Sequence, residues 1–187
     1  MRRKRKIDPI GLWARDRRMA AVHEAGHIVI AKMLGVPVGL AYIYFTTGRN
    51  LDPLDHKTWR GKTYCGYQRA KKRQRCMIGV AGAVAELSWR GAPIDGEYWV
   101  DPMMMSPSDW SLVECEPGNP DDKCIEAIGS VTEVLERGAS HWPKLVMETR
   151  KLIVASQPIL QAKLKQPLAN RTSHTRRPDL PRWRTLS

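Results

Sequence analysis

The chain has 187 residues, of which 42% are hydrophobic, and it carries a formal net charge of +12. This length predicts one domain with enough apolar side chains for a buried core. Its four cysteines form no CxxC pair, which excludes a disulfide scaffold and a zinc finger of the usual spacing. We expect reduced thiols and a cytoplasmic location.

The positive charge lies at the two ends of the chain. Residues 1–18 carry eight basic and two acidic side chains, and residues 161–187 carry seven basic and one acidic. In contrast, residues 76–160 carry six basic and thirteen acidic side chains. A globular body with basic arms is expected from this distribution. The expected division is a basic N-terminal arm at 1–14, a domain at 15–165 and a flexible basic tail at 166–187.

Neither a secretory signal nor a membrane span is expected. The basic start, MRRKRK, is not followed by an apolar segment. The longest weakly charged run, 28–45, contains Gly35, Pro37 and Gly39, which favour the end of a helix, a turn and a strand over a transmembrane helix.

The first predicted helix covers about 15–34 and contains an HExxH motif, His23-Glu24-Ala25-Gly26-His27. Residues four apart share one face of a helix, so both imidazoles can point at one metal ion. Glu24 lies beside them, where it can act as a general base. The second half of this helix is apolar nearly all round, and a metal would account for burying such polar groups in it.

The rest of the pattern predicts a mainly α fold: an array of five to six helices with a small two-stranded β-ribbon, and the zinc site on the HExxH helix. The small residues at 79–85 permit another helix to pack closely, and Pro158 is expected to kink or end the last helix. The expected elements are a strand at 38–46, a polar loop at 48–63, a second strand at 64–67, and helices at 74–90, from 106–109, at 121–137 and at 142–165.

The HExxH pair needs a third protein ligand, and the spacing excludes two arrangements. An extended HExxHxxGxxH motif would need glycine and histidine where the chain has Ile30 and Met33. No carboxylate lies between His27 and Asp52, which excludes a ligand glutamate about twenty residues past the second histidine. The candidates further along are Asp52, Asp55, His56, Glu86, Asp95, Glu97, Asp101, Asp109, Glu114 and His141.

Two of these candidates stand out. Glu86 is the only acid in the apolar stretch 76–89, so it should face something polar inside the protein. Asp109 follows Ser106-Pro107-Ser108 at a predicted helix start, where the helix dipole alone would also favour an acid.

Three segments, in this order, resemble the peptidase domain of FtsH-type membrane-associated proteases. HEAGH at 23–27 matches the first motif of that family, GVAGAVAELSW at 79–89 resembles its LAGRAAEE helix, and SPSDWSLV at 106–113 resembles its ASNDL segment. The resemblance covers about residues 15–160. Two positions depart from the pattern: Ala83 replaces an arginine and Ser108 replaces an asparagine.

The resemblance implies one Zn²⁺ per chain, held by His23, His27 and Asp109, with Glu24 as catalytic base. It also implies that Glu86 orients a ligand imidazole. The strand at 38–46 resembles the edge strand of the family, which implies that it holds an extended substrate. Its expected substrate-binding residues are Ile43, Tyr44 and Phe45.

The expected function is that of a zinc-dependent metalloendopeptidase that hydrolyses peptide bonds of proteins or unstructured peptides. The sequence contains no GxxxxGK[ST] loop, so the expected activity is independent of ATP. One alternative is a weak or inactive FtsH-like module that binds nucleic acid, or acts as an adaptor for an acidic partner, through its basic arms. Another is a peptidase relative that binds zinc without catalysis. The pattern leaves the oligomeric state open.

Overall fold

A computed structural model describes residues 9–46, 59–92, 94, 105–115, 120–138 and 140–164. It confirms the expected class, because these ranges form five α-helices and one two-stranded antiparallel sheet. The elements are α1 (Pro9–Met33), β1 (Val38–Phe45), β2 (Trp59–Cys65), the 3₁₀ turn η1 (Tyr67–Arg69), α2 (Lys72–Arg90), α3 (Pro107–Val113), α4 (Asp122–Thr132), the π-helical turn η2 (Glu133–Arg137) and α5 (Trp142–Leu164). None of the helices in these ranges is both long and apolar enough to cross a membrane.

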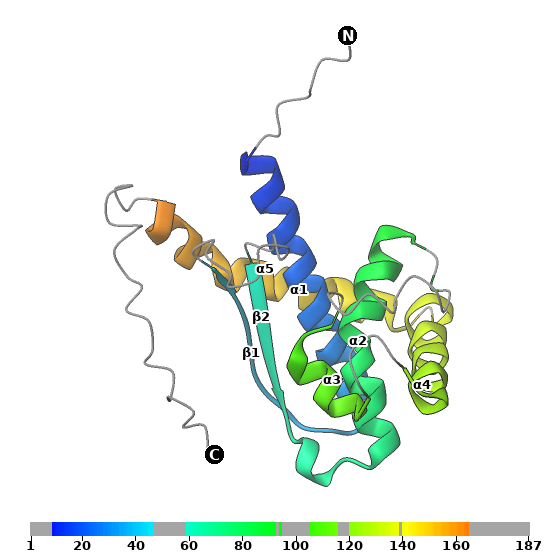
Figure 1. Ribbon diagram of the computed structural model, residues 1–187. Helices are drawn as coiled ribbons and strands as arrows, with labels where there is room; N and C mark the ends of the chain where they lie inside the picture. The colour runs from blue at the N-terminus through cyan, green and yellow to red at the C-terminus, as the bar shows by residue number, and fades with distance from the viewer. Residues whose placement is uncertain are drawn as a thin grey trace, which may run out of the picture.

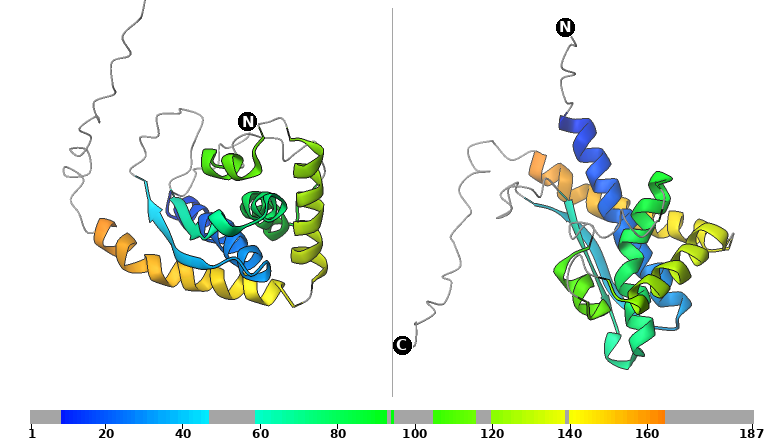
Figure 2. Two further views of the ribbon diagram at one scale, coloured as in Figure 1. Left: turned by 90° about the horizontal axis from the view of Figure 1, so that it is seen from below. Right: turned by 45° about the vertical axis from the view of Figure 1, so that its right-hand side comes forward.

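Helix α2 is the central element, with α1, α3 and α4 packed around it (Figures 1 and 2). Its small residues permit this close packing. A side-chain carbon on Gly26 of α1 would lie 2.5 Å from the Ala81 carbonyl oxygen, and one on Gly79 of α2 would lie 2.8 Å from a methyl group of Val113 in α3. Both α1 and α3 can therefore approach the backbone of α2, and these two helices carry the expected metal ligands.

The β-ribbon lies on α1, and β1 also contacts α5 (Figure 2). Ile43 lies opposite Gly61 and Phe45 lies opposite Trp59 in the antiparallel register. The side chains of Ile43 and Trp59 are buried against the helices. The outward-facing residues alternate with these, as in a sheet that is solvated on one face.

The second strand begins earlier than the sequence pattern indicated. The expected polar loop at 48–63 and strand at 64–67 are wrong in part, because residues 59–63 already belong to β2. Trp59, Gly61 and Thr63 point to the same face of β2, which is the alternation expected of a strand. The pattern is hard to recognise in the sequence, because Gly61 has no side chain and the residues between are charged. Residues 47–58 lie outside the described ranges.

The first and last helices differ from their expected bounds. Helix α1 begins at Pro9, so residues 9–14 of the expected basic arm are helical. Helix α5 continues through Pro158 to Leu164, which shows that this proline does not end it. Residues 1–8 of the expected arm and the whole expected tail, 166–187, lie outside the described ranges.

Candidate metal centre

Side chains from two helices converge at one point. His23 and His27 lie one turn apart on α1, and Asp109 reaches them from α3. The Nε2 atom of His23 lies 3.3 Å from Asp109 Oδ2, and the Nε2 atom of His27 lies 3.5 Å from Asp109 Oδ1. One ligand atom from each side chain can be chosen so that all three lie within 4.8 Å of one another.

These three side chains could hold a metal ion, and the distances in zinc sites offer a comparison. Zinc ligand atoms lie about 2.0–2.1 Å from the metal, so two ligand atoms of a tetrahedral site are roughly 3.3 Å apart. The two nitrogen–oxygen distances, 3.3 and 3.5 Å, are close to this value, although they run to different oxygens of Asp109 and a set of one atom from each side chain spans up to 4.8 Å. Two imidazoles and one carboxylate are also a donor set that leaves a fourth position open in catalytic zinc sites.

The other nitrogen of each imidazole is already engaged. His23 Nδ1 lies 2.9 Å from Glu86 Oε1, and His27 Nδ1 lies 2.7 Å from the carbonyl oxygen of Ile78. Both partners are acceptors, so each Nδ1 must carry the proton and donate it. The Nε2 atom of each ring therefore faces Asp109, and it would offer its lone pair to a metal ion that replaced the proton there, as the imidazoles of metal sites do.

The electrostatics of the three groups favour a cation between them. Burial opposes the charged form of His23, but hydrogen bonds to Asp109 and Glu86 outweigh it and raise its pKa from 6.5 to about 10. Burial likewise opposes ionisation of Asp109, yet the electrostatic influence of the neighbouring His27 and the hydrogen bond to His23 lower the pKa of that carboxyl. A proton on His23 compensates the negative charge of the two carboxylates. A divalent cation bound between the side chains would replace that proton.

Glu24 is held next to the ligands without being one of them. Its side chain is 5% exposed, and its Oε2 atom accepts a hydrogen bond of 2.6 Å from the Thr63 hydroxyl. A side-chain carbon on Gly61, two residues earlier on β2, would overlap the Glu24 side chain. Strand β2 therefore confines the Glu24 carboxylate, and only one of the two carboxylate oxygens accepts the hydrogen bond from Thr63.

The N-terminus of α3 fixes Asp109. Ser106 caps this helix, and Pro107 occupies its first turn. The Ser106 backbone amide and hydroxyl donate hydrogen bonds of 2.9 and 2.7 Å to Asp109 Oδ2. The capping interaction thus orients the carboxylate whose other oxygen faces His27.

A cavity of about 570 Å³ opens onto the metal ligands and Glu24. Strand β2 lines it with every residue from Trp59 to Tyr64, whereas Tyr44 is the one residue of β1 that does so. The edge of β2 that is not paired with β1 therefore borders the cavity.

The three expected substrate-binding residues differ in their position relative to the cavity. The structure brings only Tyr44 to the cavity. Ile43 is 1% exposed, because it points at the helices, and the ring of Phe45 packs on Trp59 with 5.7 Å between the ring centroids. Within the described ranges, the strand that lines most of the cavity is β2, and β1 contributes Tyr44 alone.

The other candidates for the third ligand lie elsewhere or outside the described ranges. Glu114 forms ion pairs of 2.8 and 2.6 Å with Lys72 and Arg75. His141 precedes α5 and does not line the cavity. The candidates outside the described ranges are Asp52, Asp55, His56, Asp95, Glu97 and Asp101.

Several residues at the site were not foreseen from the sequence. Thr63 and Gly61 touch Glu24, and a side-chain carbon on Gly82 would overlap the His23 ring. Tyr67 also lines the cavity, where burial, followed by its hydrogen bond to Cys65, raises the pKa of its hydroxyl. The sequence offered little indication of these contacts, because a glycine or a threonine in a short strand or a helix has many structural explanations.

No family model matches the chain, and no protein in the curated set is significantly similar to it.

Proposed function

We propose that this chain is a zinc-dependent peptidase that hydrolyses peptide bonds in proteins or unstructured peptides. The observation that carries the proposal is the convergence of His23, His27 and Asp109, with the buried carboxylate of Glu24 beside them. When bound, zinc supplies Lewis acidity, which acidifies water and polarises a carbonyl group.

Residues of the chain would transfer the proton and orient the groups that take part in the reaction. Glu24 is placed to take a proton from the attacking water and to pass it to the amine that leaves when the peptide bond breaks. Thr63 donates a hydrogen bond to one Glu24 oxygen, which leaves the other oxygen to carry that proton. Glu86 and the Ile78 carbonyl hold the two imidazoles in the tautomer that ligates through Nε2.

The motif resemblance to FtsH-type peptidase domains supports the same reaction. It assigns to His23, His27, Asp109 and Glu24 the roles that their positions here favour. The proposed activity needs no ATP, so the expected substrates are peptides and unfolded segments.

The decisive variant is Glu24→Gln, which preserves size and hydrogen bonding but removes the base. We expect it to bind zinc as the unmodified chain does and to lose hydrolysis of a casein-like unfolded substrate. Metal content by mass spectrometry and cleavage by gel would be measured, with a chelator as a second control. If Glu24→Gln cleaved the substrate as fast as the unmodified chain, the proposed role of Glu24 as the base would be wrong.

The described residues lend less support to the nucleic-acid or adaptor alternative than to the peptidase. In the basic segment 69–75, Lys72 and Arg75 pair with Glu114, and Arg73 pairs with Glu126 at 2.9 Å. This alternative would instead rest on the basic ends. Salt-sensitive binding of DNA or RNA, without any proteolysis, would favour it.

A further inference from the structure

The outward face of α5 carries a groove with exposed apolar side chains. Residues spaced by three or four positions share this face of the helix: Pro143, Met147, Arg150 and Val154. A groove of about 720 Å³ runs along them, and the described residues that line it lie between Pro143 and Ala155. Met147 is 47% exposed and Val154 is 65% exposed. Because both lie in one groove rather than scattered singly over the surface, they form a candidate contact face.

Positive charge surrounds this groove. The only acid among residues 142–157 is Glu148, which is buried and pairs with Lys32. Within the described ranges, no carboxylate lies within 4.0 Å of the charged nitrogens of Lys144 or Arg150. A partner that covers the groove would therefore need apolar side chains with negative charge beside them.

The outward face of α4, together with the first residue of η2, has these properties. Its residues recur at the same spacing: Asp122, Ile125, Gly129 and Glu133. Ile125 is 52% exposed, and a side-chain carbon on Gly129 would meet no atom of another element within 4 Å. Among the described residues, no cation lies within 4.0 Å of the carboxylates of Asp122 or Glu133. Another helix could therefore approach the middle of this face closely, between two acids.

The two faces can meet only between copies of the chain. Helices α4 and α5 lie on adjacent sides of the molecule, and their outward faces point in different directions (Figure 2). The stripe on α5 covers residues 143–154 and the stripe on α4 and η2 covers residues 122–133. Each is about 16 Å long at 1.5 Å per residue, so the two match in length as well as in charge.

We propose that the chain associates head to tail with a second copy of itself, with the α5 face of one copy packed on the α4 face of the next. The apolar side chains of the two stripes would cover one another, and Lys144 and Arg150 would approach the acids of α4. Neither stripe lines the cavity at the candidate metal centre, so the contact does not depend on the proposed peptidase function.

A second copy fits the α5 face better than two other occupants do. The ends of the chain are basic, with eight basic and two acidic side chains at 1–18 and seven basic and one acidic at 161–187, so the α5 face would repel them. A nucleic acid would pair with the cations, but Met147 and Val154 in the middle of the groove offer nothing to a phosphate group.

A head-to-tail contact uses a different face on each partner, so every copy can bind one neighbour on either side. A single pair of helices makes a small interface, and such interfaces are typical of weak association. Sedimentation velocity of the full chain should therefore show a mass that rises with protein concentration and passes that of a dimer.

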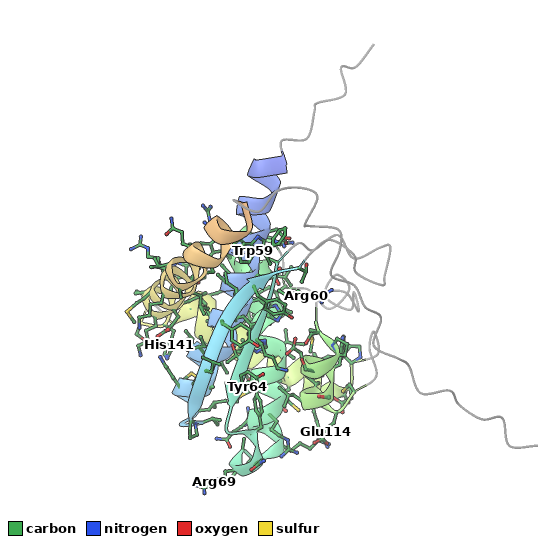
Figure 3. All side chains as sticks on the ribbon, turned by 90° about the vertical axis from the view of Figure 1, so that its left-hand side faces the viewer. Trp59, Arg60, Tyr64, Arg69, Glu114 and His141 are labelled. Carbon is green, nitrogen blue, oxygen red and sulfur yellow. The ribbon has the colours of Figure 1, made fainter. Side chains whose placement is uncertain are left out.

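Two charge reversals test the two faces. Arg150→Glu and Glu133→Lys should each weaken self-association at least about tenfold, because each places like charges opposite one another. Both residues are exposed, so the helical circular dichroism should not change. The matched control is Arg69→Glu, an equal charge change at an exposed residue of η1, which Figure 3 labels apart from α5. This variant should associate as the unmodified chain does.

A mixture of the two variants tests whether the contact is head to tail. Arg150→Glu keeps the α4 face intact, and Glu133→Lys keeps the α5 face intact. An equimolar mixture should therefore associate at concentrations at which each variant alone is monomeric. A contact between two α5 faces would respond to Arg150→Glu alone and would not be regained in the mixture, and this result would overturn the proposal.

The proposal is also wrong if the unmodified chain remains monomeric up to its solubility limit. Binding of a single-stranded oligonucleotide by that monomer, lost in Arg150→Glu, would then assign the α5 face to nucleic acid. Association that Arg69→Glu weakens as much as the two stripe variants do would reflect net charge alone and would equally overturn the assignment of the two faces.

Discussion

Glu86 contacts the candidate metal centre through His23. Its Oε1 atom accepts the Nδ1 proton of that imidazole at 2.9 Å, and Oε2 accepts a hydrogen bond of 3.1 Å from Arg90. Replacing such a partner of a metal-ligating histidine lowers metal affinity about 10–100-fold. We expect Glu86→Gln to lower zinc affinity within this range, measured by competition with a chromogenic chelator.

The control for this variant removes an acid that lies away from the site. Glu126→Gln breaks the exposed pair with Arg73 and should leave zinc affinity unchanged. Equal zinc affinities for Glu86→Gln and the unmodified chain, with the helical circular dichroism of both intact, would show that Glu86 has no orienting role.

Gly61 controls the position of the base rather than of the metal. A side-chain carbon at this residue would overlap Glu24, which must then move away from the cavity. Displacing a reacting group by about 1 Å can cost about 100-fold in rate. Gly61→Ala should therefore reduce hydrolysis of a peptide by this order while zinc content stays at one per chain.

Gly39 on the neighbouring strand supplies the matched control for Gly61. The nearest atom to a side-chain carbon there is the Tyr64 carbonyl oxygen at 3.6 Å, an ordinary contact. Gly39→Ala should hydrolyse the same peptide at nearly the unmodified rate. If the two alanine variants are equally active, β2 does not confine Glu24.

At the scale of elements, regular hydrophobic patterns were predictable and short irregular ones were not. The apolar run before Gly35 predicted the end of α1 closely but not its start at Pro9, and the small residues of 79–85 lie in α2, whose bounds were predicted closely. Residues 59–63 of β2 were expected as loop, because their strand character comes from pairing with β1 rather than from their own composition. Side-chain pairing across strands is a tertiary property that one segment cannot reveal.

One ion pair joins α1 to α5. Lys32 donates a hydrogen bond of 2.8 Å to Glu148, which also accepts one of 3.3 Å from Lys151. Burial opposes ionisation of Glu148, but the two lysines outweigh it and lower the pKa of its carboxyl. Because Lys32 is exposed, we expect Glu148→Gln to cost only about 0.5–1 kcal/mol of the free energy of unfolding.

The sign of the pH dependence follows from the lowered pKa of Glu148. Its contribution is complete above the ordinary value of 4.5 and is lost as the pH falls through the lower folded value. Urea unfolding should therefore separate Glu148→Gln from the unmodified chain at pH 6 and bring the two together in more acidic buffer. Glu126→Gln, which removes an exposed ion pair, should lower the free energy of unfolding less at pH 6. If the stability difference between Glu148→Gln and the unmodified chain grew on acidification, the lowered pKa of Glu148 would be contradicted.

For the whole molecule, the sequence could supply two candidate metal ligands but not the packing that brings the third candidate to them. His23 and His27 follow from helical geometry alone. Asp109 lies 86 residues after His23 and was one of ten candidates. Composition and position narrowed these to Glu86 and Asp109, and the motif resemblance then favoured Asp109. Its arrival depends on the packing of α1 and α3 on the small residues of α2, through Gly26 and Gly79.

This long-range arrangement predicts that metal and fold stabilise each other. A ligand that binds only the folded state at 100 times its dissociation constant adds about 2.7 kcal/mol to the free energy of unfolding. For a domain of this size, that corresponds to a rise in Tm of about 5–11 °C. Scanning calorimetry of the zinc-loaded chain, before and after a strong chelator, should show a fall of this order.

Asp109→Asn separates this effect from unspecific binding of zinc. The amide keeps the size of the side chain but removes the negative charge that joins α3 to the two imidazoles of α1. Added zinc should then raise Tm much less than in the unmodified chain, because a site that no longer spans both helices cannot favour their packing. An equal zinc-dependent rise in both proteins would mean that the ion binds on α1 alone.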